Sequence, residues 1–150
     1  MKWSKDNSIV LSKACIWLFA AAEVVCGVTM PLVVDGIVRR RGMPAVSGRL
    51  YFVSSLYLLM VPATIALYYL YRLLSNISKE EVFVRQNVVL LRRISWACVL
   101  AAVISLVFTV GYQPFLMLAA AAGFMALILR VVKNVFAEAV ALKEENDFTI

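Results

Sequence analysis

Histidine is absent from this sequence of 150 residues, and only 16% of the residues are charged. The first absence removes the commonest general base and the commonest zinc ligand. Cysteine occurs three times at widely separated positions, which excludes a disulfide-stapled module and offers no paired metal-binding spacing. Six glycines and four prolines are too few for a collagen-like fibre, and the shortage of charge argues against a disordered chain.

Apolar side chains are what the sequence has in abundance. Hydrophobic residues make up 63% of it, and the mean hydropathy of +0.88 lies above the range of soluble domains. A helix needs about 20 apolar residues to cross a membrane. Four stretches meet that length, at about residues 14–34, 50–71, 94–112 and 115–135. We therefore predict an all-α integral membrane protein, a four-helix bundle that forms a single domain over residues 1–150. The short connection between the last two spans makes them an antiparallel hairpin.

The distribution of lysine and arginine predicts the orientation of these helices. With four spans, both termini and the loop between the second and third spans lie on one side of the membrane. Only four of the 15 cations lie on the other side, namely Arg39, Arg40, Arg41 and Arg49. The positive-inside rule therefore places both termini in the cytoplasm. Cations spread over both faces favour contact with anionic membrane lipids over direct binding of nucleic acid.

One carboxylate, that of Glu23, falls inside the first span. At about 1.5 Å per residue it lies roughly 14 Å beyond the start of the span, where an ionised carboxylate is costly. Such a group should be protonated, paired or exposed to a polar cavity. Arg130 in the fourth span is the candidate ionic partner, and hydroxyl groups are offered by Thr29, Thr64, Ser105 and Thr109. Glu23 and Arg130 form our candidate intramembrane polar site, for which a structural hydrogen bond and a functional role are equally open.

The segments outside the spans also carry helical patterns. Ser78 followed by Glu81 has the spacing of a capping box, which predicts a short cytoplasmic linker helix over about residues 79–93, lying on the membrane surface. Beyond the fourth span, apolar residues keep helical spacing while acidic residues accumulate. This pattern predicts a helical cytoplasmic C-terminal tail over residues 136–150. Its acidic end would pack on another protein or on the basic patch of Arg85, Arg92 and Arg93.

Two stretches on the predicted cytoplasmic side resemble a known family. Residues 83–94, FVRQNVVLLRRI, are similar to the signature F-x-x-x-N-V-x-x-L-R-x-I of the YoaS-like bacterial membrane proteins, domain of unknown function family 2975. Residues 142–150, LKEENDFTI, are similar to the L-x-E-E-x-D-L-T-I terminus of that family, with Phe148 in place of the usual leucine. The resemblance implies a four-helix protein of the bacterial plasma membrane, frequently encoded beside a small helix-turn-helix regulator. It implies no catalytic or binding residue.

The residues that match these motifs lie together on the predicted cytoplasmic side. With the neighbouring Arg93 they form our candidate clasp or partner site, which consists of Phe83, Asn87, Leu91, Arg92, Arg93, Glu145, Asp147 and Ile150. A common structural clasp on this side is the first interpretation, and a docking site for a partner is the second.

No motif for a nucleotide, a catalytic nucleophile or a metal occurs in the sequence, so we expect no enzyme, no cofactor and no metal site. The first hypothesis is a sensor, regulatory or interaction subunit that acts through its cytoplasmic face. Its partner would be a small helix-turn-helix regulator or another membrane subunit. The alternatives are a small transporter or channel subunit, or a lipid- or amphiphile-binding bundle, that uses Glu23. Four short helices leave little room for a private pathway, so a transport function favours a homo-oligomer.

Overall fold

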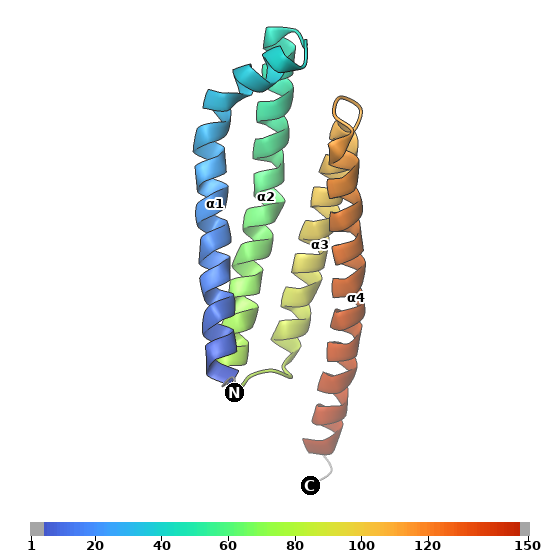
Figure 1. Ribbon diagram of the computed structural model, residues 1–150. Helices are drawn as coiled ribbons and strands as arrows, with labels where there is room; N and C mark the ends of the chain where they lie inside the picture. The colour runs from blue at the N-terminus through green and yellow to red at the C-terminus, as the bar shows by residue number, and fades with distance from the viewer. Residues whose placement is uncertain (1–4, 148–150) are drawn as a thin grey trace.

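The computed structural model describes residues 5–147, which form four long helices. These are α1 (Lys5–Arg40), α2 (Ala45–Ser78), α3 (Arg85–Phe108) and α4 (Pro114–Asp147), and no strand occurs among the described residues. All four are long and apolar enough to cross a membrane, as the sequence predicts. The loops at 41–44 and 109–113 lie at one end of the molecule, here the upper end. The start of α1, the loop at 79–84 and the end of α4 lie at the lower end (Figure 1).

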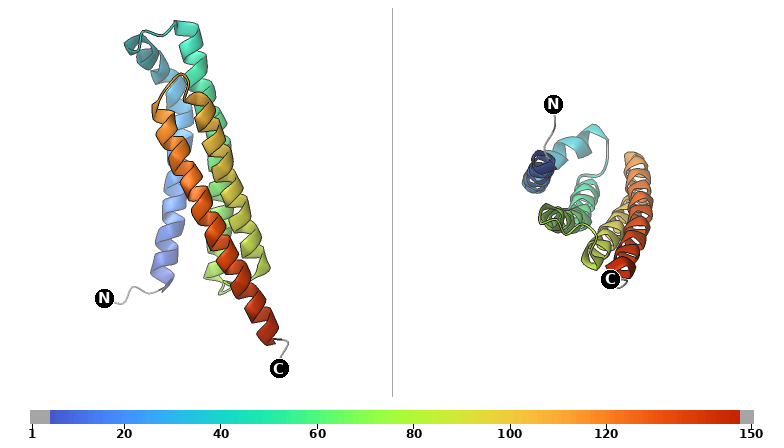
Figure 2. Two further views of the ribbon diagram at one scale, coloured as in Figure 1. Left: turned by 90° about the vertical axis from the view of Figure 1, so that its right-hand side faces the viewer. Right: turned by 90° about the horizontal axis from the view of Figure 1, so that it is seen from below.

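The four helices form an open, curved row. Each helix packs on its neighbours in the chain, and no backbone approach joins α1 to α4 within residues 5–147. Seen from below, the row bends into an arc (Figure 2). The four predicted helices are therefore confirmed, and within residues 5–147 they form an open row and not a closed bundle. Lipid tails are as apolar as the helix surfaces, so an apolar face left uncovered by protein carries no penalty that would force the row to close.

Two clusters of buried side chains hold the row, one toward each end. The upper cluster consists of Val34 and Val38 from α1 and Phe52 from α2. The lower cluster joins α2 to α3 and is covered by side chains of α4; its buried members are Leu73, Leu90, Leu91 and Ile94. Small buried side chains, among them Ala97 and Ala126, let α3 and α4 approach, and beside the lower cluster the buried Ser95 hydroxyl donates to the carbonyl of Ala126 at 3.0 Å.

Proline and glycine determine how α1 meets α2. Pro31 has no N–H to donate to the carbonyl of Gly27, four residues earlier. The Tyr57 hydroxyl of α2 donates to that carbonyl instead, at 3.0 Å. Gly27 also permits the close approach, because a Cβ there would lie 2.9 Å from the Met60 methyl carbon. The last turns of α1 lean toward α2 (Figure 1).

The linker helix predicted over residues 79–93 does not exist as a separate element. Helix α2 continues to Ser78, residues 79–84 form a loop, and α3 runs without a break from Arg85 into its apolar part. Ser78 lies in the last turn of α2, so it cannot cap a new helix. The chain instead turns at Glu80, whose φ of 65° is left-handed, and the amides of Glu80 and Glu81 donate to carbonyls of the last turn of α2. This Schellman-type end overrides the capping-box spacing.

The tail predicted over residues 136–150 is the direct continuation of α4. The helix remains unbroken to Asp147, and residues 148–150 lie outside the described residues.

Candidate functional site at the lower end

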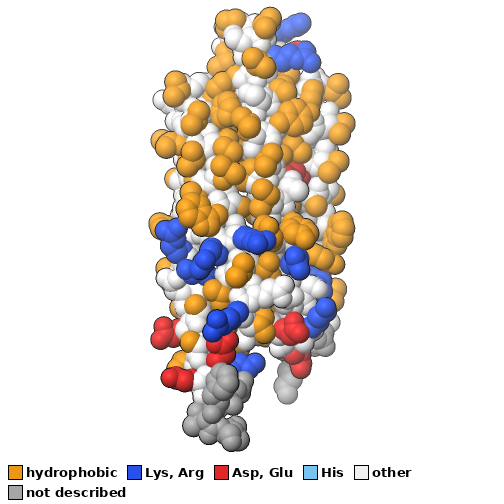
Figure 3. Space-filling view, turned by 180° about the vertical axis from the view of Figure 1, so that it is seen from behind, with side chains coloured by type: hydrophobic (Ala, Val, Ile, Leu, Met, Phe, Trp, Pro, Cys, Tyr) orange, Lys and Arg blue, Asp and Glu red, His pale blue; other side chains and the backbone are white. Residues whose placement is uncertain are grey.

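A belt of aromatic and cationic side chains crosses all four helices near the lower end. Three contacts form it: Trp17 against Tyr71, Arg93 over Tyr69, and Arg130 over Trp96. Arg93 also donates to the Tyr69 hydroxyl at 2.9 Å. We call these six residues the lower belt. Figure 3 shows cations gathered at this level, with apolar side chains above them and carboxylates below. Tyrosine, tryptophan and cations with these surroundings are typical of a membrane–water interface.

A second belt lies at the upper end. The rings of Tyr51, Phe52, Phe108, Tyr112 and Phe115 contact one another, and Arg41 lies 4.1 Å over the Tyr112 ring. We call these six residues the upper belt. On α2 the two belts are about 18 to 20 residues apart, which corresponds to roughly 27 to 30 Å of helix. This separation matches a hydrocarbon core about 30 Å thick.

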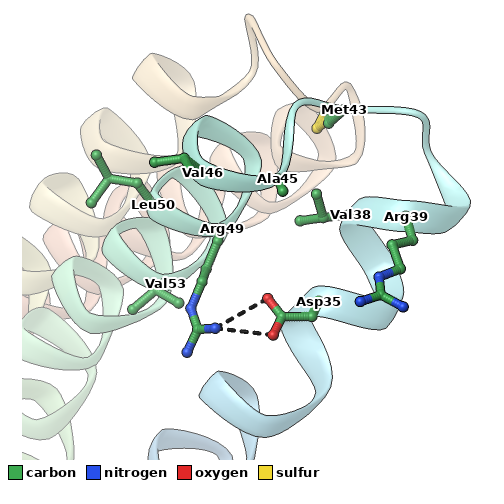
Figure 4. A pocket seen from close by; sticks show the side chains of 9 residues that line it. All are labelled: Asp35, Val38, Arg39, Met43, Ala45, Val46, Arg49, Leu50 and Val53. Atoms are coloured by element: carbon green, nitrogen blue, oxygen red, sulfur yellow. Dashed lines mark hydrogen bonds and ion pairs between the residues drawn. The ribbon is translucent and has the colours of Figure 1, made fainter.

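An ion pair closes the upper end of the α1–α2 hairpin. Asp35 and Arg49 point toward one another across a hollow of about 590 Å³, with a shortest distance of 2.9 Å (Figure 4). The rest of the hollow is largely apolar, and both charged side chains are about half exposed. Gly48 permits the packing beneath, because a Cβ there would lie 2.9 Å from a methyl of Val38. The arrangement fastens the hairpin and brings together none of the predicted site residues.

The candidate intramembrane pair, Glu23 and Arg130, is not brought together. Glu23 accepts a hydrogen bond from the Thr64 hydroxyl of α2 at 2.8 Å, whereas Arg130 stacks over Trp96 of α3. The separation follows from the open row, in which α1 and α4 do not meet. Of the two kinds of partner considered from the sequence, a cation or a hydroxyl group, it is a hydroxyl, that of Thr64, that contacts Glu23. Beside Glu23 lies an apolar groove of about 420 Å³, lined also by Phe19, Ala22, Cys26, Ala63, Ala66 and Leu67.

Asn87 organises the loop below the lower belt. Its side chain is fully buried, and its amide nitrogen donates to the carbonyls of Glu81 at 2.7 Å and Val82 at 2.8 Å. Its amide oxygen accepts from the side chain of Asn76, the residue near the end of α2, at 2.8 Å. One side chain therefore satisfies three groups and fixes the turn from α2 into α3. Of the residues proposed as a clasp or partner site, Asn87 therefore joins the end of α2 to the start of α3.

The lower parts of α3 and α4 are joined by separate contacts. Arg85 donates two hydrogen bonds to the Glu144 carboxylate, at 2.9 and 2.7 Å. Phe83 stacks on Phe136 with ring centroids 5.8 Å apart, and Leu91 is buried in the lower cluster. The acidic end of the chain thus lies on the basic patch predicted for it, through Arg85.

The remaining predicted residues have different positions. Arg92 lies in a polar pocket with four neighbours on α3 and α4, and Arg93 belongs to the lower belt. Glu145 is exposed one residue beyond Glu144. The side chain of Asp147 and the whole of Ile150 lie outside the described residues.

One known protein family matches most of the chain. The family described as "Protein of unknown function (DUF2975)" matches residues 17–150. The chain belongs to this family. The match confirms the resemblance drawn from the two motifs and extends it into the first helix. No curated protein and no solved structure matches the chain.

Four residues that complete these contacts in this member of the DUF2975 family are not among the predicted site residues. They are Asn76, Ser95, Trp96 and Lys133. A signal for the last three is present in the sequence. The turn at 109–113 fixes the register of the α3–α4 hairpin, and residues equally far from the turn on the two helices face one another. Counting outward in this way places Arg92 opposite Arg130. For Asn76 no comparable signal exists, because its partner is set by the loop.

Proposed function

We propose that this protein is a non-enzymatic interaction or regulatory subunit of the bacterial plasma membrane. Both termini lie in the cytoplasm, and the lower ends of α3 and α4 hold a cytoplasmic partner. The observation that carries the proposal is the extension of α3 and α4 below the lower belt. Glu144 is fourteen residues beyond Arg130, the belt residue on α4, which places it about 21 Å farther along the helix.

Apolar side chains on this extension remain uncovered. Phe83 is 46% exposed, Val89 44% and Leu142 61%. A groove of about 290 Å³ between the helices has a floor of Val88, Val89, Ala137, Val140 and Ala141, and Arg85 and Glu144 flank it. Between the two belts, exposed apolar side chains are covered by lipid. Below the lower belt such side chains face water, where contiguous apolar surface marks a site for another protein.

The ion pair of Arg85 with Glu144 and the hydrogen bonds of Asn87 support this function, because they hold the lower ends of α2, α3 and α4 in place before a partner binds. A preorganised surface loses little conformational entropy on binding. The family resemblance suggests a small helix-turn-helix regulator as the partner, with another membrane subunit as the alternative. A sensing function would follow if a change in the membrane altered the packing of α3 and α4 and so the groove.

The test is a pull-down of tagged full-length protein from its native membrane in mild detergent, followed by mass spectrometry. We expect a stoichiometric cytoplasmic protein that is lost with Val89→Lys and with Ala141→Glu. Val46→Lys is the matched control, because Val46 is 84% exposed at the upper end. A second, differently tagged copy of the chain in the same membrane tests for a homo-oligomer. Recovery of the partner with all three variants would contradict the proposal.

A second function is favoured by one observation, the contact between Glu23 and Thr64 beside the apolar groove. Glu23 is six residues from Trp17 of the lower belt, about 9 Å along the helix and therefore within the apolar zone. We propose as the alternative a small transporter or channel subunit, or a lipid- or amphiphile-binding protein, in which this carboxyl group is the polar element. Proteoliposomes should then show a flux that Glu23→Gln abolishes. The absence of flux from the parent protein, with a clean apo protein in mass spectrometry, would exclude the alternative.

A further inference from the structure

A polar pocket of about 320 Å³ opens between α3 and α4 at the level of the lower belt. Its lining consists of Arg92, Ser95 and Trp96 from α3 and Arg130 and Lys133 from α4. The first three recur at positions i, i+3 and i+4 and the last two at i and i+3, so each set occupies one face of its helix. The register of the hairpin therefore builds the pocket from two facing rows.

The charges in this pocket are all positive. Among the described residues that line it, three are cations and none is a carboxylate. Elsewhere in residues 5–147 Arg49 is paired with Asp35 and Arg85 with Glu144, but neither ion pair involves Arg92, Arg130 or Lys133. Arg130 lies over the face of Trp96, at 5.9 Å, and the Ser95 hydroxyl already donates to Ala126. Three like charges converging on one pocket repel one another, and a bound anion would relieve that repulsion.

The position of the pocket indicates which class of anion it would bind. The lower belt marks the predicted membrane interface, so the pocket lies at the depth of lipid headgroups, and Trp96 is 59% exposed beside it. Above the pocket α3 and α4 present exposed apolar side chains, including Val103 and Leu127. A phosphate held by the cations would therefore have its acyl chains in contact with an apolar helix surface.

We propose that this pocket binds the phosphate group of an acidic phospholipid. Guanidinium groups donate paired hydrogen bonds to phosphate, and the lysine supplies a point charge. Basic pockets between membrane helices are suited to such headgroups. The inference is independent of the partner proposed above, because the pocket lies at the belt and the groove for the partner lies below it.

The experiment uses full-length protein in an uncharged detergent and measures lipid binding by native mass spectrometry. Phosphatidylglycerol and phosphatidylcholine with the same acyl chains are titrated separately, and inorganic phosphate is added as a competitor. We expect one phosphatidylglycerol to bind in preference to phosphatidylcholine. Arg130→Gln and Lys133→Gln should each weaken that binding about five- to tenfold, as expected for one interfacial cation. Arg130→Lys should retain most of it, which separates the loss of charge from a loss of structure.

Arg72→Gln is the matched control, because Arg72 is an exposed cation that lies over Tyr68 near the same belt but outside the pocket. It should change the affinity less than twofold. Equal binding of the two lipids, or equal weakening by Arg72→Gln, would overturn the proposal. Displacement of the lipid by inorganic phosphate at millimolar concentration would assign the pocket to a soluble phosphate compound and would overturn the lipid assignment.

Discussion

Substitution of Asn87 tests whether one buried amide holds the turn between α2 and α3. Asn87→Ala removes two donors from the carbonyls of Glu81 and Val82 and one acceptor from Asn76. At about 1 kcal/mol of net stabilisation for each hydrogen bond, the variant should lose about 3 kcal/mol. Asn87→Asp keeps the size of the side chain but places oxygen against two carbonyls. It should therefore be at least as destabilising as the alanine variant.

The free energy of unfolding is measured in mixed micelles, where the helices remain membrane-like and the loop is in water. Asn76→Ala breaks only the third hydrogen bond, so its loss should be about 1 kcal/mol. The double variant should lose no more than Asn87→Ala alone, because the Asn76 interaction is already absent from it. The cycle therefore predicts a coupling of about 1 kcal/mol between the two asparagines.

Two results would refute this reasoning. The first is a loss below about 1 kcal/mol for Asn87→Ala, which would mean that water satisfies the two carbonyls as well as the side chain does. The second is additivity of the two single variants, which would mean that the asparagines do not interact. Helical content from circular dichroism is the control, since α2 and α3 should remain intact in every variant.

Three further predictions use the same unfolding measurement. Glu80→Gly should stabilise the protein by about 1 kcal/mol because the φ of 65° costs glycine nothing; a loss of stability would show that Glu80 is not strained. Gly111→Ala should cost about 1 to 3 kcal/mol because its Cβ would lie 2.8 Å from the Tyr51 ring, which is held in place by the hydrogen bond that its hydroxyl donates to the Phe108 carbonyl. Gly123→Ala should be tolerated, because its Cβ would lie 4.0 Å from Ala102. Equal effects of the two alanines would argue against the steric explanation. Tyr57→Phe should cost about 0.6 to 1.7 kcal/mol, and this cost should disappear in a Pro31→Ala background, where the new N–H can reach the Gly27 carbonyl. Persistence of the cost would show that the hydroxyl acts in another way.

The apolar helices are the part of the fold that the sequence predicts well. Apolar runs as long as those of α2 and α4 have no stable alternative to a helix in lipid, so their number and order follow from hydropathy alone. The residues at which α2 ends and α3 begins, at the lower end, do not follow from hydropathy. Ser78 and Glu81 satisfy the pattern of a helix start, yet α2 carries on through Ser78, because the Schellman-type turn at Glu80 and the Asn87 network determine where α3 begins. Local spacing cannot reveal a competition decided by a residue six to nine positions away.

For the candidate site too, the sequence indicates some of the contacts and not others. Asn87 and Phe83, which the family motifs single out, both make contacts between helices or loops, and the acidic end of α4 reaches the basic patch at Arg85. The pairing of Glu23 with Arg130 fails because charge complementarity contains no information on which helices are neighbours. Only the order of packing decides that, and α1 has α2 as its neighbour.

The open row has a consequence for how the protein is made. Because close backbone packing joins each helix only to the one before it and the one after it, the main part of every interface can form as soon as its second helix leaves the ribosome. What α4 adds to α2 are side-chain contacts, such as that of Phe115 with Tyr51. Assembly can therefore follow the order of translation, with contacts that are local in sequence and correspondingly quick to form.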